Sequence, residues 1–257
     1  MNKTLVTFLV IFNFGFSYGG DFPLIGTQMK SLNSDTHAYG ICQRGIYDFI
    51  SDDIWHLKEA GTCHIQVIDK QGVSTLSQDN EIWSPVGWLN SNEILALRET
   101  RKSLVGDSQD RYEIHKISTT GKNSQLLFDL SYPGANEYSL SPNGNRLIFG
   151  DESYNLYLYD IKENKITPLD NIIGKGFAIL WQPDSHSFYF RSYSDRNIYQ
   201  YHLKNQTLLQ ITDFQPNSAQ LRGRPLQKIS RDGNKLLVLY SKPAGPSVHY
   251  SLWLHTV

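Results

Sequence analysis

Leu140-Ser-Pro-Asn-Gly144, Trp181-Gln-Pro-Asp-Ser185 and Ile229-Ser-Arg-Asp-Gly233 are three copies of the short phrase that decides the fold of this chain. Each copy is followed by an apolar run, such as Arg146-Leu-Ile-Phe149 after the first. A fainter fourth copy reads Gly87-Trp-Leu-Asn-Ser91. Aligned on their Asn or Asp residues (Asn90, Asn143, Asp184 and Asp232), the copies are 53, 41 and 48 residues apart. In an all-β protein, a repeat of this length is typical of a propeller.

The residues around each copy predict a four-stranded antiparallel blade. Asn-Gly, Asp-Gly and Asp-Ser favour tight hairpins between apolar runs, because Gly and Asn adopt positive φ at little cost. Third strands rich in alternating Tyr, Ile and Leu are expected at 112–117, 155–160, 197–203 and 251–254. Fourth strands are expected at 125–128, 165–169 and 208–211. Four strands per repeat, with almost no helix, correspond to one propeller blade.

The N-terminal part of the chain follows this pattern less clearly. Residues 38–42 and 45–50 are expected to form the first hairpin of a further blade, with 63–69 and 73–77 as its third and fourth strands. This gives a β-propeller of five blades, with six as the alternative if one blade is degenerate. The last repeat stops after its third strand, so we expect a segment near Phe22–Met29 to complete it and hide both sheet edges.

Two stretches of the repeat, Ser141–Phe149 and Ser194–Thr212, resemble the repeats of TolB-type propellers. Similar repeats occur in the propeller domains of prolyl oligopeptidase relatives and in periplasmic sensor domains. The resemblance covers residues 84–257 well and 38–77 weakly. It is specific for the fold and says little about the ligand. It implies no catalytic triad, because the peptidase relatives carry their nucleophile in a separate hydrolase domain.

The N-terminus has the pattern of a secretory signal peptide. A charged start at Met1–Lys3 precedes an apolar run at Leu5–Phe16, and Ser17–Gly19 offers small residues at the cleavage positions. The apolar run is shorter than the roughly 20 residues that span a bilayer. We therefore expect residues 1–19 to be removed, and residues 20–257 to form a single β-propeller domain that is periplasmic or secreted and does not span a membrane.

The two cysteines, Cys42 and Cys63, lie in the least regular blade. In an oxidising compartment an even number of cysteines this close in sequence usually forms a disulfide. The bond would close a loop of about 22 residues and contribute about 3 kcal/mol in the chain-entropy model. Two buried free thiols are the alternative. A metal site is not expected, because His64 beside Cys63 faces the other side of a strand.

Charge and motifs exclude several classes of function. The formal net charge is −1, and no basic tract of the kind that binds nucleic acid is present. The sequence lacks the Gly-x-Ser-x-Gly, His-Glu-x-x-His, Gly-x-Gly-x-x-Gly and phosphate-loop signatures. No catalytic residue, cofactor or metal is therefore predicted. His64, His115 and His202 are interpreted as hydrogen-bonded residues within sheets.

Residues that bind a partner are expected in loops that lead into a first strand or join a second strand to a third. Such loops surround the mouth of a propeller, and exposed aromatic rings and arginines in them are typical of interface hot spots. The alternative is that the tryptophan belongs to the core and the arginines are ordinary surface charges. The candidates are Trp83, Tyr132, Lys175, Arg222 and Arg224.

Three functions fit the sequence. The favoured one is an exported, monomeric propeller that binds a protein or an envelope component without catalysis. The first alternative is a hydrolase or lyase that acts on a glycan at the propeller mouth. The second is the periplasmic sensory domain of a membrane-anchored regulator that keeps residues 5–19 as its anchor.

Overall fold

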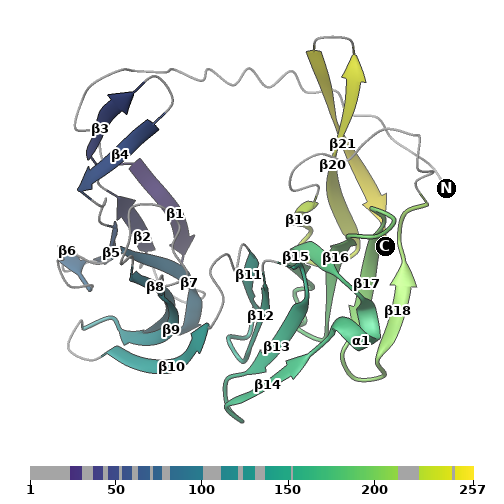
Figure 1. The fold of residues 1–257 in the computed structure, drawn as a ribbon. Coiled ribbons are helices and arrows are strands. Elements are labelled where there is room, and N and C mark those ends of the chain that lie inside the picture. The colour runs from purple at the N-terminus through teal and green to yellow at the C-terminus, as the bar shows by residue number, and fades with distance from the viewer. Residues whose placement is uncertain are drawn as a thin grey trace. The chain divides into compact units, whose positions relative to one another are not determined.

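The computed structural model describes residues 24–30, 37–42, 46–51, 54–59, 63–69, 72–76, 82–100, 111–120, 124–130, 137–151, 153–213, 226–244 and 247–257. These residues form β-strands and one short helix (Figure 1), which confirms the all-β class. They group into an N-terminal unit, Gly15–Ala135, and a C-terminal unit, Asn136–Val257, each with its own sheets. Among the described residues, no helix has the length and apolar character needed to cross a membrane. The predicted signal peptide lies outside them.

The described strands of the C-terminal unit form three antiparallel sheets, ordered along the chain. The first consists of β11 (Glu137–Leu140), β12 (Arg146–Gly150), β13 (Leu156–Asp160) and β14 (Lys165–Pro168). Helix α1 (Asp170–Ile173) leads to β15 (Gly176–Trp181), β16 (Ser187–Ser192), β17 (Ile198–His202) and β18 (Thr207–Gln210). The third contains β19 (Leu226–Ile229), β20 (Lys235–Ala244) and β21 (Ser247–Thr256). The predicted four-stranded sheets are confirmed in the first two.

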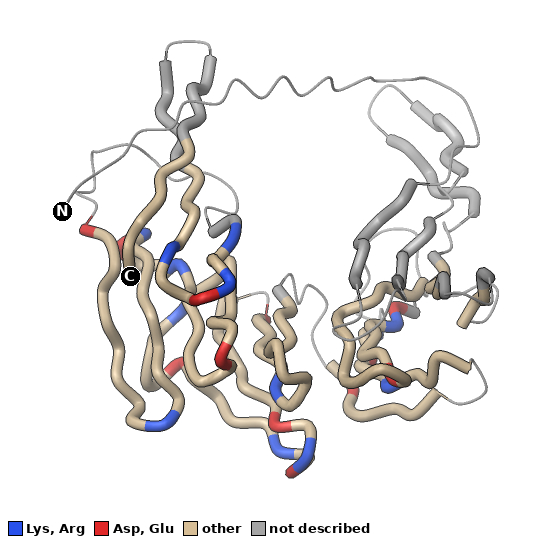
Figure 2. Tube along the Cα trace, turned by 180° about the vertical axis from the view of Figure 1, so that it is seen from behind, with Lys and Arg blue, Asp and Glu red and all other residues tan. Residues whose placement is uncertain are grey.

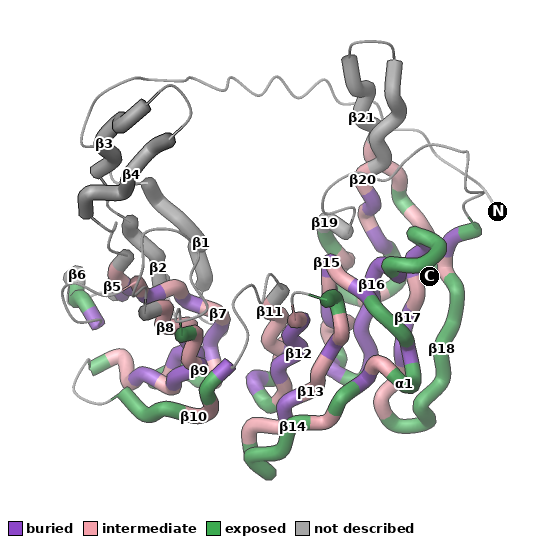
Figure 3. The backbone as a smooth tube through the Cα atoms, in the orientation of Figure 1, coloured by how far each residue is buried: buried purple, intermediate pink, exposed green. Residues whose placement is uncertain are grey.

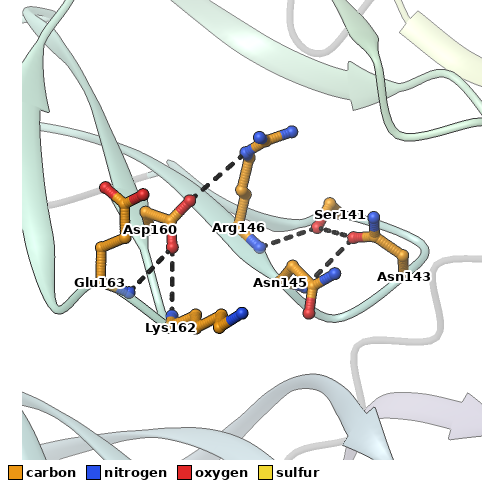
Figure 4. A network of polar contacts seen from close by, with 7 residues as sticks. All are labelled: Ser141, Asn143, Asn145, Arg146, Asp160, Lys162 and Glu163. Atoms are coloured by element: carbon orange, nitrogen blue, oxygen red, sulfur yellow. Dashed lines mark hydrogen bonds and ion pairs between the residues drawn. The ribbon is translucent and has the colours of Figure 1, made fainter.

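Local side-chain bonds hold the hairpin turns where the repeated phrase lies. Ser141 Oγ donates to Asn143 Oδ1 (2.8 Å) and accepts from the backbone N–H of Arg146 (2.9 Å). Gly144 has a φ of 71°, the left-handed value that this turn requires. Figure 4 shows this turn beside Asp160, whose carboxylate lies 3.7 Å from Arg146 Nε and also bonds the next turn. The phrase therefore specifies where the strand reverses.

The third copy repeats this chemistry, and successive turns are bonded to one another. Ser230 Oγ donates to Asp232 Oδ1 (2.5 Å), and Gly233 has a φ of 76°. Between sheets, the backbone N–H of Asn143 donates to Ser185 Oγ (3.1 Å). A Cβ on Gly233 would lie 2.5 Å from Gln182 Oε1, so this glycine also allows the neighbouring turn to approach. The hairpin ends of consecutive sheets thus lie side by side.

The core of the C-terminal unit lies between neighbouring sheets. Phe188 and Phe190 of β16 pack with Ile148 and Leu156 of the preceding sheet. Tyr189, which lies between them in sequence, packs with Leu236 of the following sheet. This two-residue alternation makes β16 buried on both faces, whereas the outer strand β18 is exposed (Figure 3). A fully buried side chain of this size contributes about 2 kcal/mol.

The N-terminal unit is less regular. A four-stranded group has the order β1 (Leu24–Lys30), β2 (His37–Cys42), β5 (Cys63–Asp69) and β6 (Gly72–Thr75). One parallel pair, Cys63 with Ile82, joins it to β7 (Ile82–Asn90), β8 (Glu93–Thr100), β9 (Arg111–Ser118) and β10 (Ser124–Leu130). A separate hairpin consists of β3 (Ile46–Ser51) and β4 (Ile54–Glu59).

Two expectations for this unit are wrong. Residues 38–42 and 45–50 do not form a hairpin together, because β2 pairs with β1 and β5 while β3 pairs with β4. The segment near Phe22–Met29 does not complete the last sheet either, because β1 pairs with β2 in the N-terminal sheet. The second difference follows the tendency of strands that are consecutive in sequence to pair with each other. The number of blades stays a prediction.

Candidate functional site

Three connections of the C-terminal unit meet at the strand ends opposite the hairpin turns. They are the β12–β13 loop, the entry to β15 and the β16–β17 loop. The backbone N–H of Gly176 donates to the carbonyl of Tyr154 (2.9 Å), and that of Tyr193 donates to the carbonyl of Lys175 (2.9 Å). These are the kinds of loop expected at a propeller mouth, and backbone hydrogen bonds fix their positions relative to one another.

Aromatic rings and guanidinium groups gather where these connections meet. We call Tyr154, Phe177, Tyr193, Arg191 and Arg196 the aromatic–arginine cluster. The rings of Tyr154 and Tyr193 stack with centroids 4.7 Å apart, and the ring of Phe177 lies 5.7 Å from that of Tyr154. The Cζ atom of Arg196 lies 4.7 Å above Tyr193, and that of Arg191 lies 5.2 Å above Phe177. Both distances suit cation–π attraction.

The two loops that carry the cluster share one backbone design. Tyr154 and Arg196 have φ values of 64° and 65°, which bulky residues rarely adopt. Each of them directly precedes an asparagine. The carboxylate of Asp151 accepts the backbone N–H of the first asparagine (2.9 Å), and that of Asp195 accepts that of the second (3.0 Å). The loop aspartates thus stabilise the strained conformation that holds Tyr154 and Arg196 at the strand ends.

Arg191 is a buried cation that pairs with none of the described carboxylates. Its residue is 4% exposed, and its Nε donates to the backbone carbonyl of Arg196 (3.3 Å). Among the described residues, no carboxylate forms an ion pair with Arg191 or Arg196. Burial, followed by repulsion from Arg196, lowers the pKa of Arg191 to about 10. Arg191 therefore stays protonated at neutral pH, at a cost in desolvation.

The nearby carboxylate of Asp195 is engaged within its own loop. Burial opposes its ionisation, but hydrogen bonds from the hydroxyl of Tyr199 (2.6 Å) and the backbone of Asn197 (3.0 Å) outweigh that effect. The pKa of Asp195 is therefore lowered. Burial and the bond to Asp195 raise the pKa of Tyr199 to about 12. Asp195 is thus an ionised acceptor that orders the loop.

The predicted partner-binding residues have different outcomes. Lys175 is exposed and lies at the entry to β15, beside the cluster. Trp83 is only 4% exposed and packs with Ile65 and Val67. The expectation of an exposed ring is therefore wrong, and Trp83 belongs to the core. The cause is the two-residue alternation of β7, which places Trp83 on its buried face. The remaining candidates, Tyr132, Arg222 and Arg224, lie outside the described residues.

The sequence contained a signal for the cluster that motif searches do not register. Asn155-Leu-Tyr and Asn197-Ile-Tyr open the third strands of consecutive repeats. Aligning the repeats on these asparagines places Tyr154 and Arg196 at one position of the repeat. Two bulky residues at one position of the repeat, each in a loop that contains an aspartate, are the sequence signal for this site.

A second polar cluster lies within the N-terminal unit. The carboxylate of Glu113 accepts from Arg98 Nη1 (2.9 Å) and lies 2.8 Å from Nε2 of His115. His115 Nδ1 lies 2.9 Å from Ser124 Oγ, which confirms the interpretation of this histidine as a hydrogen-bonded residue within a sheet. Burial opposes ionisation of Glu113, but the bonds from His115 and Arg98 outweigh it and lower its pKa. In this cluster, unlike at Arg191, the arginine is paired with a carboxylate.

Charged residues elsewhere in the C-terminal unit lie mostly at turns and strand ends, with both signs intermixed (Figure 2). Within the described ranges, no three His, Cys, Asp or Glu side chains lie close enough together to hold a metal ion.

Comparison with solved structures supports the fold. TolB from Acinetobacter baumannii matches with a TM-score of 0.51 at 18% identity, over 76% of this chain and 46% of that one. An oligogalacturonate lyase, solved in complex with manganese, matches with a TM-score of 0.58 at 14% identity, over 90% of this chain and 65% of that one. The chain thus spans less than two thirds of either protein. No protein-family model and no curated protein matches the sequence. The expected resemblance to TolB-type propellers is confirmed at the level of the fold.

Proposed function

We propose that this protein is an exported, monomeric propeller that binds another protein or an envelope component through the aromatic–arginine cluster, without catalysis. The single observation that carries the proposal is the exposed Tyr154–Tyr193 stack with Arg196 above it, at the loop end of two consecutive sheets. Tyrosine and arginine are the residue types in which binding energy concentrates at interfaces.

The geometry of the cluster suits a preformed binding surface. Tyr154 is 36% exposed and Tyr193 is 40% exposed, so both rings offer apolar area to a partner. Stacking and backbone hydrogen bonds hold them before binding, which reduces the conformational entropy lost on association. Lys175 adds a flexible cation at the edge. Tyr132, Arg222 and Arg224 stay candidates for partner binding on sequence grounds alone, and Trp83 does not.

Export is proposed from the signal-like segment at residues 1–19 and from the pair of cysteines. An oxidising compartment is where a disulfide between Cys42 and Cys63 would persist.

The second candidate function is a lyase or hydrolase that acts on a glycan. The structural similarity to an oligogalacturonate lyase favours it. Such an enzyme would shorten oligogalacturonate or a related glycan, whereas a binding module would leave the glycan intact.

The test combines capture with an activity assay. A photo-reactive group placed beside the cluster should link the wild-type protein to one component of an envelope extract, which mass spectrometry identifies. Tyr193→Ala should abolish the capture of that component. Leu209→Ala is the matched control, because Leu209 is 54% exposed on β18 and its loss should leave capture unchanged. Release of products from oligogalacturonate by the wild type, with or without manganese, would replace the binding proposal with the enzyme.

A further inference from the structure

The aromatic–arginine cluster holds positive charge that no acidic group of the described residues neutralises. Arg191 and Arg196 lie close enough for each to repel the other, and Lys175 lies at the same strand ends. None of the three forms an ion pair within the described part of the chain. A stable protein rarely buries an arginine in this way without a compensating anion, because desolvating a charge is costly.

The two loop aspartates do not supply that anion. Asp151 accepts bonds from the backbone of Ser153 (2.9 Å) and from the side chain of Asn155 (2.8 Å). Asp195 is engaged by Asn197 and Tyr199. Both carboxylates are directed to the donors of their own loops and neither pairs with a cluster arginine. The described residues of these loops thus carry three cations and two carboxylates, and both carboxylates are already engaged.

The cluster favours a peptide over a sugar as the source of the anion. A pyranose ring needs an open aromatic face on which to stack. The ring of Tyr193 already contacts Tyr154 at 4.7 Å and Arg196 at 4.7 Å, and Phe177 already lies under Arg191. The guanidinium of Arg196 and parts of both tyrosine side chains stay exposed, and these suit the carboxylates and apolar side chains of an extended peptide.

We infer that the aromatic–arginine cluster binds an acidic segment of a protein partner, with a Glu or Asp carboxylate at Arg196 and apolar neighbours against Tyr154 and Tyr193. The inference rests on the proposed binding function and names its ligand chemistry. Arg196 contacts the carboxylate directly. Arg191, beneath it, is a positioning residue that adds positive potential and orients the loop through its bond to the Arg196 carbonyl (3.3 Å).

The test uses a fluorescent peptide that carries several Glu residues and one Leu, and a second peptide with Gln at the Glu positions. Anisotropy titrations with the full chain should show the Glu peptide binding about tenfold more tightly than the Gln peptide, a difference that one good charge-assisted contact supplies. The difference should shrink as salt is raised, because exposed charges are screened. Equal affinity for the two peptides would overturn the inference.

Matched arginine variants locate the contact. Arg196→Gln should weaken binding of the Glu peptide about fivefold to tenfold, and Arg191→Met should weaken it about threefold without lowering stability. Arg231→Gln is the control, because Arg231 is exposed in the β19–β20 turn at the opposite strand ends. An equal loss in Arg231→Gln would show a general charge effect and overturn the assignment. Competition by oligogalacturonate at lower concentrations than by the Glu peptide would overturn it in favour of an anionic glycan.

The inference and the proposed function fail in different ways. If Tyr193→Ala abolishes capture of the envelope component while Arg196→Gln leaves it intact, the binding function stands and the acidic ligand is wrong. If neither substitution affects capture, the cluster is not the binding surface.

Discussion

Arg98 in the N-terminal unit and Arg191 in the C-terminal unit make the same kind of contact in opposite electrostatic surroundings. Arg98 lies 5.8 Å above Trp83, and Arg191 lies 5.2 Å above Phe177. Arg98 is paired with Glu113 at 2.9 Å, whereas Arg191 has no carboxylate partner among the described residues. The first arginine belongs to a paired network that stabilises the fold, and the second is a buried charge whose potential acts at the proposed binding surface.

Substitutions in the two clusters are expected to have different effects. The side chains of Glu113 and His115 are 15% and 8% exposed, and each bonds a neighbour in the sheet. Deleting Glu113 would remove the hydrogen bonds that join its carboxylate to Arg98 and His115. In the aromatic–arginine cluster, Tyr154 and Tyr193 reach solvent, so substitutions there change a surface. We therefore expect stability effects in the N-terminal unit and binding effects in the C-terminal unit.

The largest stability effect is expected from the cysteine pair of the N-terminal unit. Cys42 and Cys63 are direct partners in the antiparallel register of β2 and β5. Opposed Cα atoms in such a pair lie about 4.5 to 5.5 Å apart, within the range that a disulfide bridges. Cys42→Ser should lower the free energy of unfolding by about 3 kcal/mol, measured by urea denaturation.

Reduction of the wild type provides the control for this substitution. It should produce the same loss of stability, and the reduced wild type should then match Cys42→Ser. Peptide mapping without reduction should recover the two cysteines joined. Free alkylation of both in the exported protein would show that the pair is a pair of thiols.

The next largest effect is expected at Glu113. Glu113→Gln removes the charge that Arg98 and His115 share, and should lower stability by about 2 kcal/mol because charge-assisted hydrogen bonds are replaced by weaker neutral ones. Glu163→Gln, at an exposed turn position, should change stability little. A Glu113→Gln variant as stable as the wild type would mean that the charges around Glu113 contribute no more to stability than those of the aromatic–arginine cluster.

The sequence predicted the regular part of this molecule better than its surface. The turn phrase at Ser141 and Ser230 carries its own hydrogen bonds, so the hairpins could be located from local chemistry alone. The pairing of β2 with β5 depends on which distant strands meet, and local pattern does not encode that. Trp83 illustrates the limit at the site, because a tryptophan before an inner strand has the same appearance in sequence whether it faces solvent or the core.

A smaller effect on stability is expected at acidic pH, where Glu113 becomes protonated. The pKa of Glu113 is lowered in the folded protein, so its contribution to stability is fully present above the unfolded pKa of about 4.3. That contribution is lost as the pH falls through the folded pKa. Unfolding measured between neutral and acidic pH should therefore show a steeper loss of stability in the wild type than in Glu113→Gln. Parallel curves for the two proteins would contradict this assignment.

The smallest effect on stability is expected at Arg191, the buried arginine that pairs with no described carboxylate. Removing a paired buried charge is costly, but removing an unpaired one relieves its desolvation. Methionine keeps apolar contact with Phe177 and loses only the long bond to the carbonyl of Arg196 (3.3 Å). Arg191→Met should therefore leave the free energy of unfolding unchanged or raise it by about 1 kcal/mol at most. A loss as large as that of Glu113→Gln, measured under the same conditions, would show that Arg191 is held by interactions of the fold itself, and the contrast between the two arginines would no longer separate stability from binding.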